Sequence, residues 1–195
     1  MKTDALKEFR CKDRAKTKEI FGAGVWTHYG FDYCSFLVAK HIHPLLDVPA
    51  QGTIVQIGCG LGLAVEKLCE LYGEDRVVGF DWLNPLNHPR IEVLDCSKLD
   101  RSMEIAFCEI DVAAASTHPE LRLHCLEWAI NNLVEGGIIL FNNNFASKHY
   151  GFDIEKYVAD RGFLIRQLSE YKHPALLENE LQSRVNSKMI CTKVN

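Results

Sequence analysis

A run of β-branched residues leads directly into three closely spaced glycines and then into an apolar helical pattern. The run is Thr53–Ile57, and the glycines are Gly58, Gly60 and Gly62. β-branched residues favour strands, and glycine permits a tight turn with positive φ. The apolar spacing over residues 63–72 has the helical period. A strand, a tight turn and a helix in succession predict the first unit of a parallel sheet with helices on both faces.

The same alternation continues along the chain. We expect strands at 76–80, 89–94, 104–110, 138–141, 163–168 and 188–194, and helices at 31–46, 63–72, 120–133 and 153–160. The segment 169–187 between the last two strands contains a proline and a polar helical stretch, with no room for an ordinary packed crossover, so these strands should be antiparallel. The predicted fold class is α/β, a Rossmann-like, doubly wound, mostly parallel seven-stranded sheet that ends in an antiparallel strand pair.

Length, charge and hydropathy exclude several classes of protein. A chain of 195 residues supports one domain, and a net charge of −4 argues against binding nucleic acid through phosphate contacts. The sequence has no apolar run of membrane-spanning length, and its charged N-terminus is unlike a signal peptide. The eight cysteines form no C-x-x-C pair, so we expect reduced thiols and a cytoplasmic protein without membrane or nucleic-acid partners.

The glycine spacing distinguishes two classes of cofactor. In the dinucleotide fingerprint G-x-G-x-x-G the third glycine would fall at position 63, which is Leu63. The spacing found, G-x-G-x-G, resembles the first motif of class I S-adenosylmethionine (SAM)-dependent methyltransferases. The resemblance extends over residues 31–195 and implies that Gly58, Cys59, Gly60 and Gly62 bind SAM.

Two acids and a Gly-Gly pair further along the chain support this resemblance. Asp81 ends the second predicted strand, where the family has an acid that accepts hydrogen bonds from the ribose hydroxyls. Asp95 and Cys96 follow the third strand, where the family's acid and the next backbone amide read the adenine. The segment Leu133–Leu140, with its Gly-Gly pair, resembles the family's entry to strand five.

One position departs from the family pattern. Two residues before the first glycine the family has Asp or Glu, which helps to hold the positively charged end of SAM, and this chain has Gln56. Glutamine can still accept a hydrogen bond but has no charge. We include Gln56 among the cofactor-binding residues, and expect either a lower affinity for SAM or a second acid that substitutes for the missing one.

The acceptor and the catalytic base should lie at the carboxyl ends of strands four and five, where open α/β sheets bind ligands. The Asn/Asp-Pro-Pro-Tyr sequence of amino-methyltransferases of DNA is absent. The segment instead resembles small-molecule O-methyltransferases, which have an acid at this strand end and a nearby histidine. That resemblance gives Glu109, Asp111 and His118 as candidate bases. At each position the alternative is structural, because acids and histidine are common around strand ends and helix N-caps.

Oxygen ligands for a divalent cation are present after strands four and five, at Glu109, Asp111, Asn142 and Asn143. Asn142 replaces a charged residue of the related metal-dependent enzymes, so we favour a site without a metal and keep a bound divalent cation as the alternative. The predicted domain is 1–195, with 1–50 as an N-terminal helical or lid extension and 51–195 as the cofactor-binding core. Residues 21–30, 142–150 and 169–187 should complete the acceptor pocket.

The sequence therefore predicts SAM-dependent methyl transfer to a small-molecule acceptor, at a hydroxyl oxygen. Two alternatives stay open. Gln56 and Asn142 are also compatible with a protein that binds SAM or a nucleoside without catalysis, as a scaffold subunit. The third reading is a nicotinamide-dependent oxidoreductase, against which Leu63 and the paired terminal strands argue.

Overall fold

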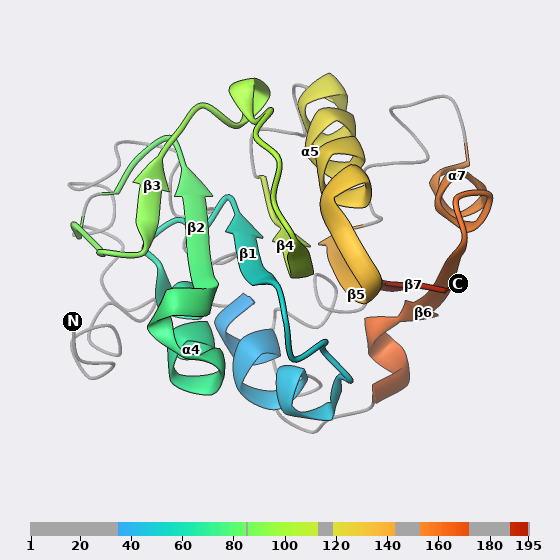
Figure 1. The fold of residues 1–195 in the computed structure, drawn as a ribbon, viewed down its shortest axis with the longest axis horizontal. Helices are drawn as coiled ribbons and strands as arrows, with labels where there is room; N and C mark the ends of the chain where they lie inside the picture. Colours follow the sequence, from blue (N-terminus) through green and yellow to red (C-terminus); the bar gives the residue numbers. More distant parts are fainter. Residues whose placement is uncertain (1–34, 85, 113–118, 143–152, 172–187, 195) are drawn as a thin grey trace.

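The computed structural model describes residues 35–84, 86–112, 119–142, 153–171 and 188–194. In this part of the chain, seven strands form one sheet in the order β3-β2-β1-β4-β5-β7-β6 (Figure 1). Neighbours from β3 to β5 pair in parallel, whereas β7 is antiparallel to both β5 and β6. The strands are β1 Thr53–Ile57, β2 Val77–Asp81, β3 Ile91–Val93, β4 Ile105–Ile110, β5 Leu133–Asn142, β6 Phe163–Gln167 and β7 Lys188–Lys193.

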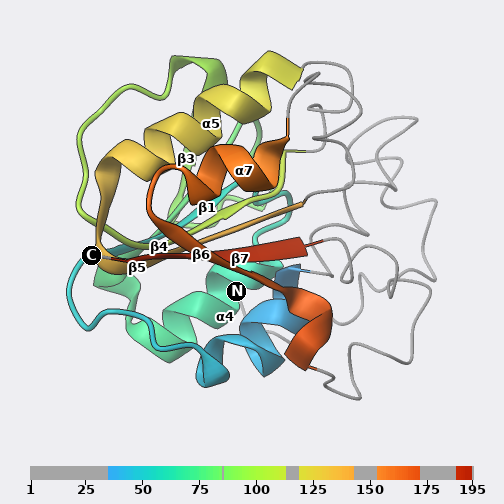
Figure 2. The same ribbon diagram turned by 90° about the vertical axis from the view of Figure 1, so that its right-hand side faces the viewer.

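Helices cover both faces of this sheet. One face carries α5 Pro119–Asn132 and α7 Ile154–Ala159, and the other carries α4 Leu63–Tyr72, a helix at 35–41 and the short helix η5 Leu168–Tyr171 (Figure 2). The remaining short helices are η1 His43–Leu45, η2 Glu74–Arg76 and η3 Cys96–Lys98. The predicted fold class is therefore confirmed, including the antiparallel terminal pair.

The fifth strand differs from its prediction. It begins at Leu133 instead of residue 138, so the Gly136-Gly137 pair lies inside the strand. Pairing with β4 is irregular between Ile105 and Phe107, and Gly136 has φ of +70°. A Cβ at Gly137 would lie 2.6 Å from Leu133 Cγ. The glycines therefore allow the backbone to bend within a strand that sheet pairing extends.

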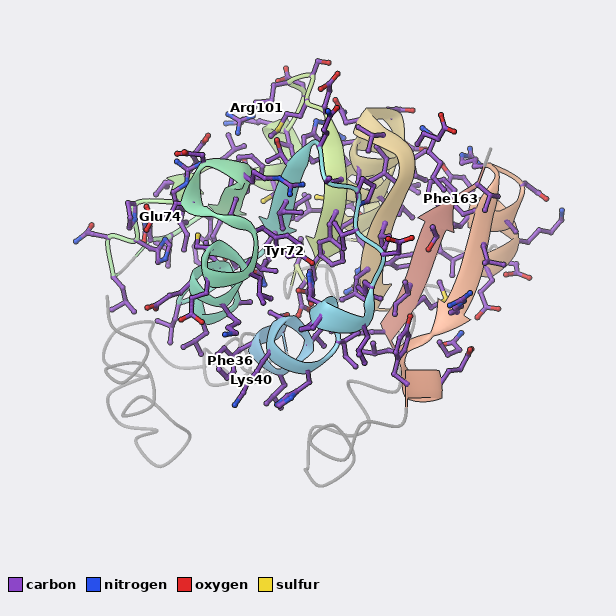
Figure 3. The ribbon with its side chains drawn as sticks, turned by 60° about the horizontal axis from the view of Figure 1, so that its bottom comes forward. Phe36, Lys40, Tyr72, Glu74, Arg101 and Phe163 are labelled. Carbon is purple, nitrogen blue, oxygen red and sulfur yellow. The ribbon has the colours of Figure 1, made fainter. Side chains whose placement is uncertain are left out.

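The strands separate two apolar layers, because successive side chains point to opposite faces. Under α5 and α7 lie residues such as Val55, Cys108 and Ile139. Under α4 and the helix at 35–41 lie residues such as Ile54 and Phe107. The helix at 35–41 belongs to this second layer, since Leu37, Val38 and Ile42 are buried, whereas Lys40 points to solvent (Figure 3).

The strand order reverses its direction at β1. From β1 the chain runs outward through β2 and β3 on one side and through β4 and β5 on the other. Ligands bind at this switch in open α/β sheets, outside the carboxyl ends of the strands. Gln56 and Glu109 pair in register near these ends, and Lys188 pairs with Asn142 at the carboxyl end of β5. Polar residues therefore gather at the edge where a ligand is expected.

Two expectations from composition can be compared with the described residues. Each of the six cysteines in this part of the chain is a free thiol, as predicted. No described helix has both the length and the apolar character needed to cross a membrane. The boundary at residue 50 between an extension and a core stays a prediction.

Phe107→Ala tests the second apolar layer. The ring is fully buried and stacks edge-on against His43 at 4.1 Å between centroids. Removing it leaves a cavity, so the free energy of unfolding should fall by about 3–5 kcal/mol. Urea titration measures the change, and Leu164→Ala on the exposed face of the edge strand β6 is the control. A similar loss in both variants would contradict the proposed layer.

Candidate functional site

The glycine turn is held by the ends of the neighbouring strands. The Gly58 amide donates to the Phe80 carbonyl at the end of β2, at 2.8 Å. Gly58 has φ of +78°, and a Cβ there would lie 2.8 Å from the carbonyl carbon of Asp111, just after β4. Glycine at this position is therefore required by contact within the protein. This contact fixes the turn directly against the end of β4.

Asp81 meets the glycine turn from the end of β2. Its Oδ2 accepts a 2.8 Å hydrogen bond from the Gly60 amide, and its Oδ1 accepts a 3.3 Å bond from the Leu83 amide. The side chain is largely buried. The structure therefore brings together the glycine and the acid that the sequence assigns to the same cofactor.

Asp95 and Cys96 form the turn that follows β3. The Asp95 carboxylate caps η3 by accepting bonds from the amide and the hydroxyl of Ser97, at 3.0 and 2.7 Å, and these bonds lower its pKa. Cys96 is buried, and burial raises the pKa of its thiol to about 12. The Leu94 amide donates to the Asp81 carbonyl at 2.8 Å, so this turn lies beside the Asp81 end of β2.

Gln56 is fully buried near the carboxyl end of β1. Within the described residues, neither its Oε1 nor its Nε2 has a hydrogen-bond partner. Leaving a buried polar group unpaired costs about 1–3 kcal/mol, and buried polar groups in folded proteins are nearly always paired. Among the described residues, the Gln56 amide two residues before the glycine turn is thus a polar group with no partner from the protein.

A buried ionic cluster lies next to Gln56. We define it by Glu109 and Asp111 of the β4 end, Lys188 of β7 and Ser35 of the helix at 35–41. The Lys188 ammonium contacts Glu109 Oε1 and lies 3.0 Å from Asp111 Oδ2. The Ser35 hydroxyl lies 2.7 Å from Glu109 Oε1 and 2.8 Å from Asp111 Oδ2, and its single proton serves one acceptor at a time. These contacts join three elements that are distant in sequence.

The electrostatics of the cluster follow from its burial. Glu109 and Lys188 are both fully buried. Burial raises the pKa of Glu109, against the opposing effect of Lys188, and Asp111 adds to the rise. Glu109 Oε2 has no hydrogen-bond partner among the described residues. The nearby His43 stays neutral, because burial and then Lys188 lower its pKa to about 3. Its Nδ1 lies 3.1 Å from the hydroxyl of Tyr72.

Three of the residues at this edge were missed by sequence reasoning. Lys188 and Ser35 complete the cluster, and Trp82, which directly follows Asp81 at the carboxyl end of β2, is 65% exposed. A signal for Lys188 was present, since a lysine opens an otherwise apolar strand pattern. Nothing in the local sequence of Ser35 distinguishes it from an ordinary helical serine.

Some predicted residues fall outside the described part of the chain. These are His118, Asn143, residues 21–30 and most of the segments 142–150 and 169–187. Asn142 ends β5, but its side chain is not among those described. Within the described residues, no group of three or more His, Cys, Asp or Glu side chains is arranged to hold a metal ion.

The sequence matches no family model and no curated protein, whereas several solved structures share its fold. The magnesium protoporphyrin IX methyltransferase ChlM from Synechocystis PCC 6803 with bound SAM has a TM-score of 0.55 at 16% identity, over 99% of this chain and 98% of that one. The sugar N-methyltransferase KedS8 from Streptoalloteichus sp ATCC 53650 has 0.54 at 10%, over 100% and 94%. An rRNA methylase from Streptococcus thermophilus has 0.50 at 14%, over 87% and 95%.

The chain therefore has the Rossmann-like fold of class I SAM-dependent methyltransferases. This agrees with the resemblance seen in the glycine turn and in the residues that follow it. The names of these three proteins give a porphyrin, a sugar and an rRNA as their acceptors. The fold is thus compatible with acceptors of very different sizes.

The described residues fit SAM in two respects. Asp81 is in direct contact with the glycine turn, and a carboxylate in that place can accept hydrogen bonds from a ribose. The unpaired Gln56 amide and the acids of the buried ionic cluster lie near the carboxyl ends of β1 and β4, on the side where a cationic group would be favoured.

Lys188→Met tests the buried ionic cluster. Removing the cation leaves two buried carboxylates without their partner, so the free energy of unfolding at pH 7.5 should fall by about 3–5 kcal/mol. Since burial already raises the pKa of Glu109, lowering the pH protonates it in the folded state and reduces this loss. Urea titrations at pH 7.5 and pH 5.5 measure both effects.

Lys98→Met is the matched control, because the Lys98 side chain is 77% exposed. It should change the free energy of unfolding little at either pH. If Lys188→Met is as stable as Lys98→Met at pH 7.5, the ion pairs contribute nothing to stability.

Proposed function

We propose that the chain is a SAM-dependent methyltransferase that acts on a small molecule, at a hydroxyl oxygen. The observation that carries the proposal is the contact of Asp81 with Gly60 in a sheet with this strand order. This contact joins a carboxylate that can accept hydrogen bonds from ribose hydroxyls to a glycine turn. The turn follows β1, where the strand order reverses. The solved structures with this fold include one with bound SAM.

In this proposal the cofactor is held by the residues assigned from sequence: Gln56, Gly58, Cys59, Gly60, Gly62, Asp81, Asp95 and Cys96. When bound, SAM supplies a methyl group that is already activated on a sulfonium. The protein then has to align the acceptor oxygen and remove its proton. Cys59 and Cys96 are buried, which supports backbone and packing roles for them.

The base remains to be assigned among Glu109, Asp111 and His118. Glu109 and Asp111 both pair with Lys188, and Glu109 is fully buried whereas Asp111 retains 6% exposure. A base must reach the acceptor proton. Between the two acids, this difference in exposure favours Asp111. His118 lies outside the described residues.

Acceptor size is inferred from the chain itself. The sheet and its helices occupy most of residues 51–195, and the helix at 35–41 also packs on the sheet. In this proposal, acceptor recognition is assigned to the rest of residues 1–50 and of the segment 169–187. The net charge of −4 also disfavours RNA. A small acceptor and a cytoplasmic location are therefore part of the proposal, with no nucleic-acid or membrane partner.

A second candidate is binding of SAM without catalysis. It is favoured by Gln56, which is uncharged at the family's acidic position, and by Lys188, which pairs with both acids of β4. The two candidates share the cofactor site and differ only in turnover.

Calorimetry with SAM tests the cofactor site. The wild-type chain should bind SAM, and Asp81→Ala should weaken binding by about 1–3 kcal/mol, since hydrogen bonds to a charged acceptor are lost. Asp81→Asn, which keeps the size and an acceptor oxygen for Gly60, checks that the turn itself survives. Asp100→Ala removes an exposed acid and should have no effect. Binding of NADH in place of SAM would overturn the proposal in favour of an oxidoreductase.

A panel of hydroxylated small molecules tests turnover. Methylated product should form with at least one acceptor, and removing the base should lower kcat by about 10²–10⁴-fold with little change in KM for SAM. Glu109→Gln, Asp111→Asn and His118→Gln are compared on that acceptor, and the variant with this pattern identifies the base. Tight SAM binding without product across the panel would favour the non-catalytic candidate.

A further inference from the structure

The buried ionic cluster has unequal numbers of opposite charges. Among the described residues it contains two carboxylates, Glu109 and Asp111, and one ammonium, Lys188. The other polar groups that the structure describes around it are uncharged: the Ser35 hydroxyl, the Gln56 amide and the neutral His43 ring. With both acids ionised, one negative charge is in excess.

An excess charge in a buried place is unfavourable for the protein alone. Ion pairs stabilise the interior only when geometry and hydrogen bonds satisfy every charged group. Here Glu109 Oε2 is buried and without a hydrogen-bond partner among the described residues, and both polar atoms of Gln56 are in the same condition. A positively charged ligand would balance this excess charge, so the cluster is more favourable with such a ligand bound than without one.

The location of the excess charge is defined by register and contact. Gln56 and Glu109 are paired residues of adjacent parallel strands, so their side chains project from the same face. Asp111 lies two residues after Glu109, and its carbonyl group packs against Gly58 of the glycine turn. The charge therefore lies beneath the start of the glycine turn. The acids that carry this charge belong to the end of β4, whereas the neighbouring residue on β1 is the neutral Gln56.

We infer that the buried ionic cluster makes the site selective for charge, so that it binds cationic SAM more tightly than the neutral product S-adenosylhomocysteine (SAH). The inference rests on the proposed function and deepens it. At neutral pH, SAM has a sulfonium, an ammonium and a carboxylate, and thus one net positive charge. SAH lacks the sulfonium charge and is neutral. When SAM is bound, its net positive charge balances the one excess negative charge beneath the turn. When SAH is bound, the negative charge has no such balance.

This selectivity has a consequence for turnover. Once the methyl group has passed to the acceptor oxygen, the product SAH would lack the sulfonium charge, and the attraction of that charge to Glu109 and Asp111 would be absent. Glu109 would then act on the cofactor and would not need to touch the acceptor, whereas Asp111 stays a candidate base. In this respect the inference assigns Glu109 a different role from that of a base.

The ratio of the dissociation constants, SAH over SAM, measures the inference without any acceptor. Calorimetry with each ligand gives the ratio for the wild type and for Glu109→Gln, which preserves the size of the side chain and removes the excess charge. The ratio should fall on the order of tenfold. Glu104→Gln is the matched control, because Glu104 is an exposed acid just before the opposite end of β4, and its ratio should stay at the wild-type value.

Charge restoration separates electrostatics from structural damage. In the double variant Glu109→Gln/Lys188→Met the cluster retains only Asp111, so the net charge returns to one negative unit. The ratio should return to within about threefold of wild type, although the double variant has lost more native contacts than Glu109→Gln. A ratio that stays low in the double variant would contradict the inference.

A pH titration of the wild-type chain serves if a variant fails to fold. The groups facing Glu109 are Lys188 of β7, Asp111 of β4, Ser35 of the helix at 35–41, Gln56 of β1 and, beyond Lys188, His43 of η1. Burial raises the pKa of Glu109, so protonation as the pH falls removes the excess charge. The SAH-to-SAM ratio is measured from pH 7 downwards to pH 5.5, where both ligands keep an ammonium and a carboxylate, and it should fall with the pH.

The outcomes separate this inference from the proposed function. Absence of binding for both ligands contradicts the proposed function. Binding of both ligands with a ratio that neither Glu109→Gln nor pH changes overturns the inference alone. A lower kcat in Glu109→Gln with an unchanged ratio would also overturn it and would assign Glu109 as the base.

Discussion

The pairing of Lys188 with Glu109 and Asp111 is the interaction on which the carboxyl edge of the sheet depends. It joins β7, β4 and, through Ser35, the helix at 35–41. A buried lysine without acids would lose its charge, and two buried acids without a cation would repel each other. Because Asp111 also packs against Gly58, the position of the glycine turn depends on the same cluster.

Much of the fold could be predicted from the sequence because its signals are local. The strand, turn and helix around Gly58–Gly62 are encoded in neighbouring residues, and Asp81 was placed by its distance from the turn. The start of β5 was predicted too late because sheet pairing extends the strand to Leu133, against the local preference of Gly136 and Gly137. Pairing of this kind depends on residues far away in sequence.

The candidate site was predictable only in part, for the same reason. Glu109 and Asp111 were identified, but their partner Lys188 lies 79 and 77 residues further along the chain. Ser35 lies 74 residues before Glu109. The sequence identified Gln56 as an uncharged residue at the family's acidic position, but it did not identify the residues that surround Gln56 in space. The structure supplies that neighbourhood, and with it an acid that register places opposite Gln56.

The position of β7 between β5 and β6 has a consequence for how the chain is made. A ribosome produces β4 with its two acids long before it produces Lys188, which belongs to the last strand in sequence. Until that strand inserts, the carboxyl edge holds two acids with no ammonium from β7. The sheet can therefore assemble in stages. The two acids at its carboxyl edge gain their lysine partner only after β7 has been synthesised.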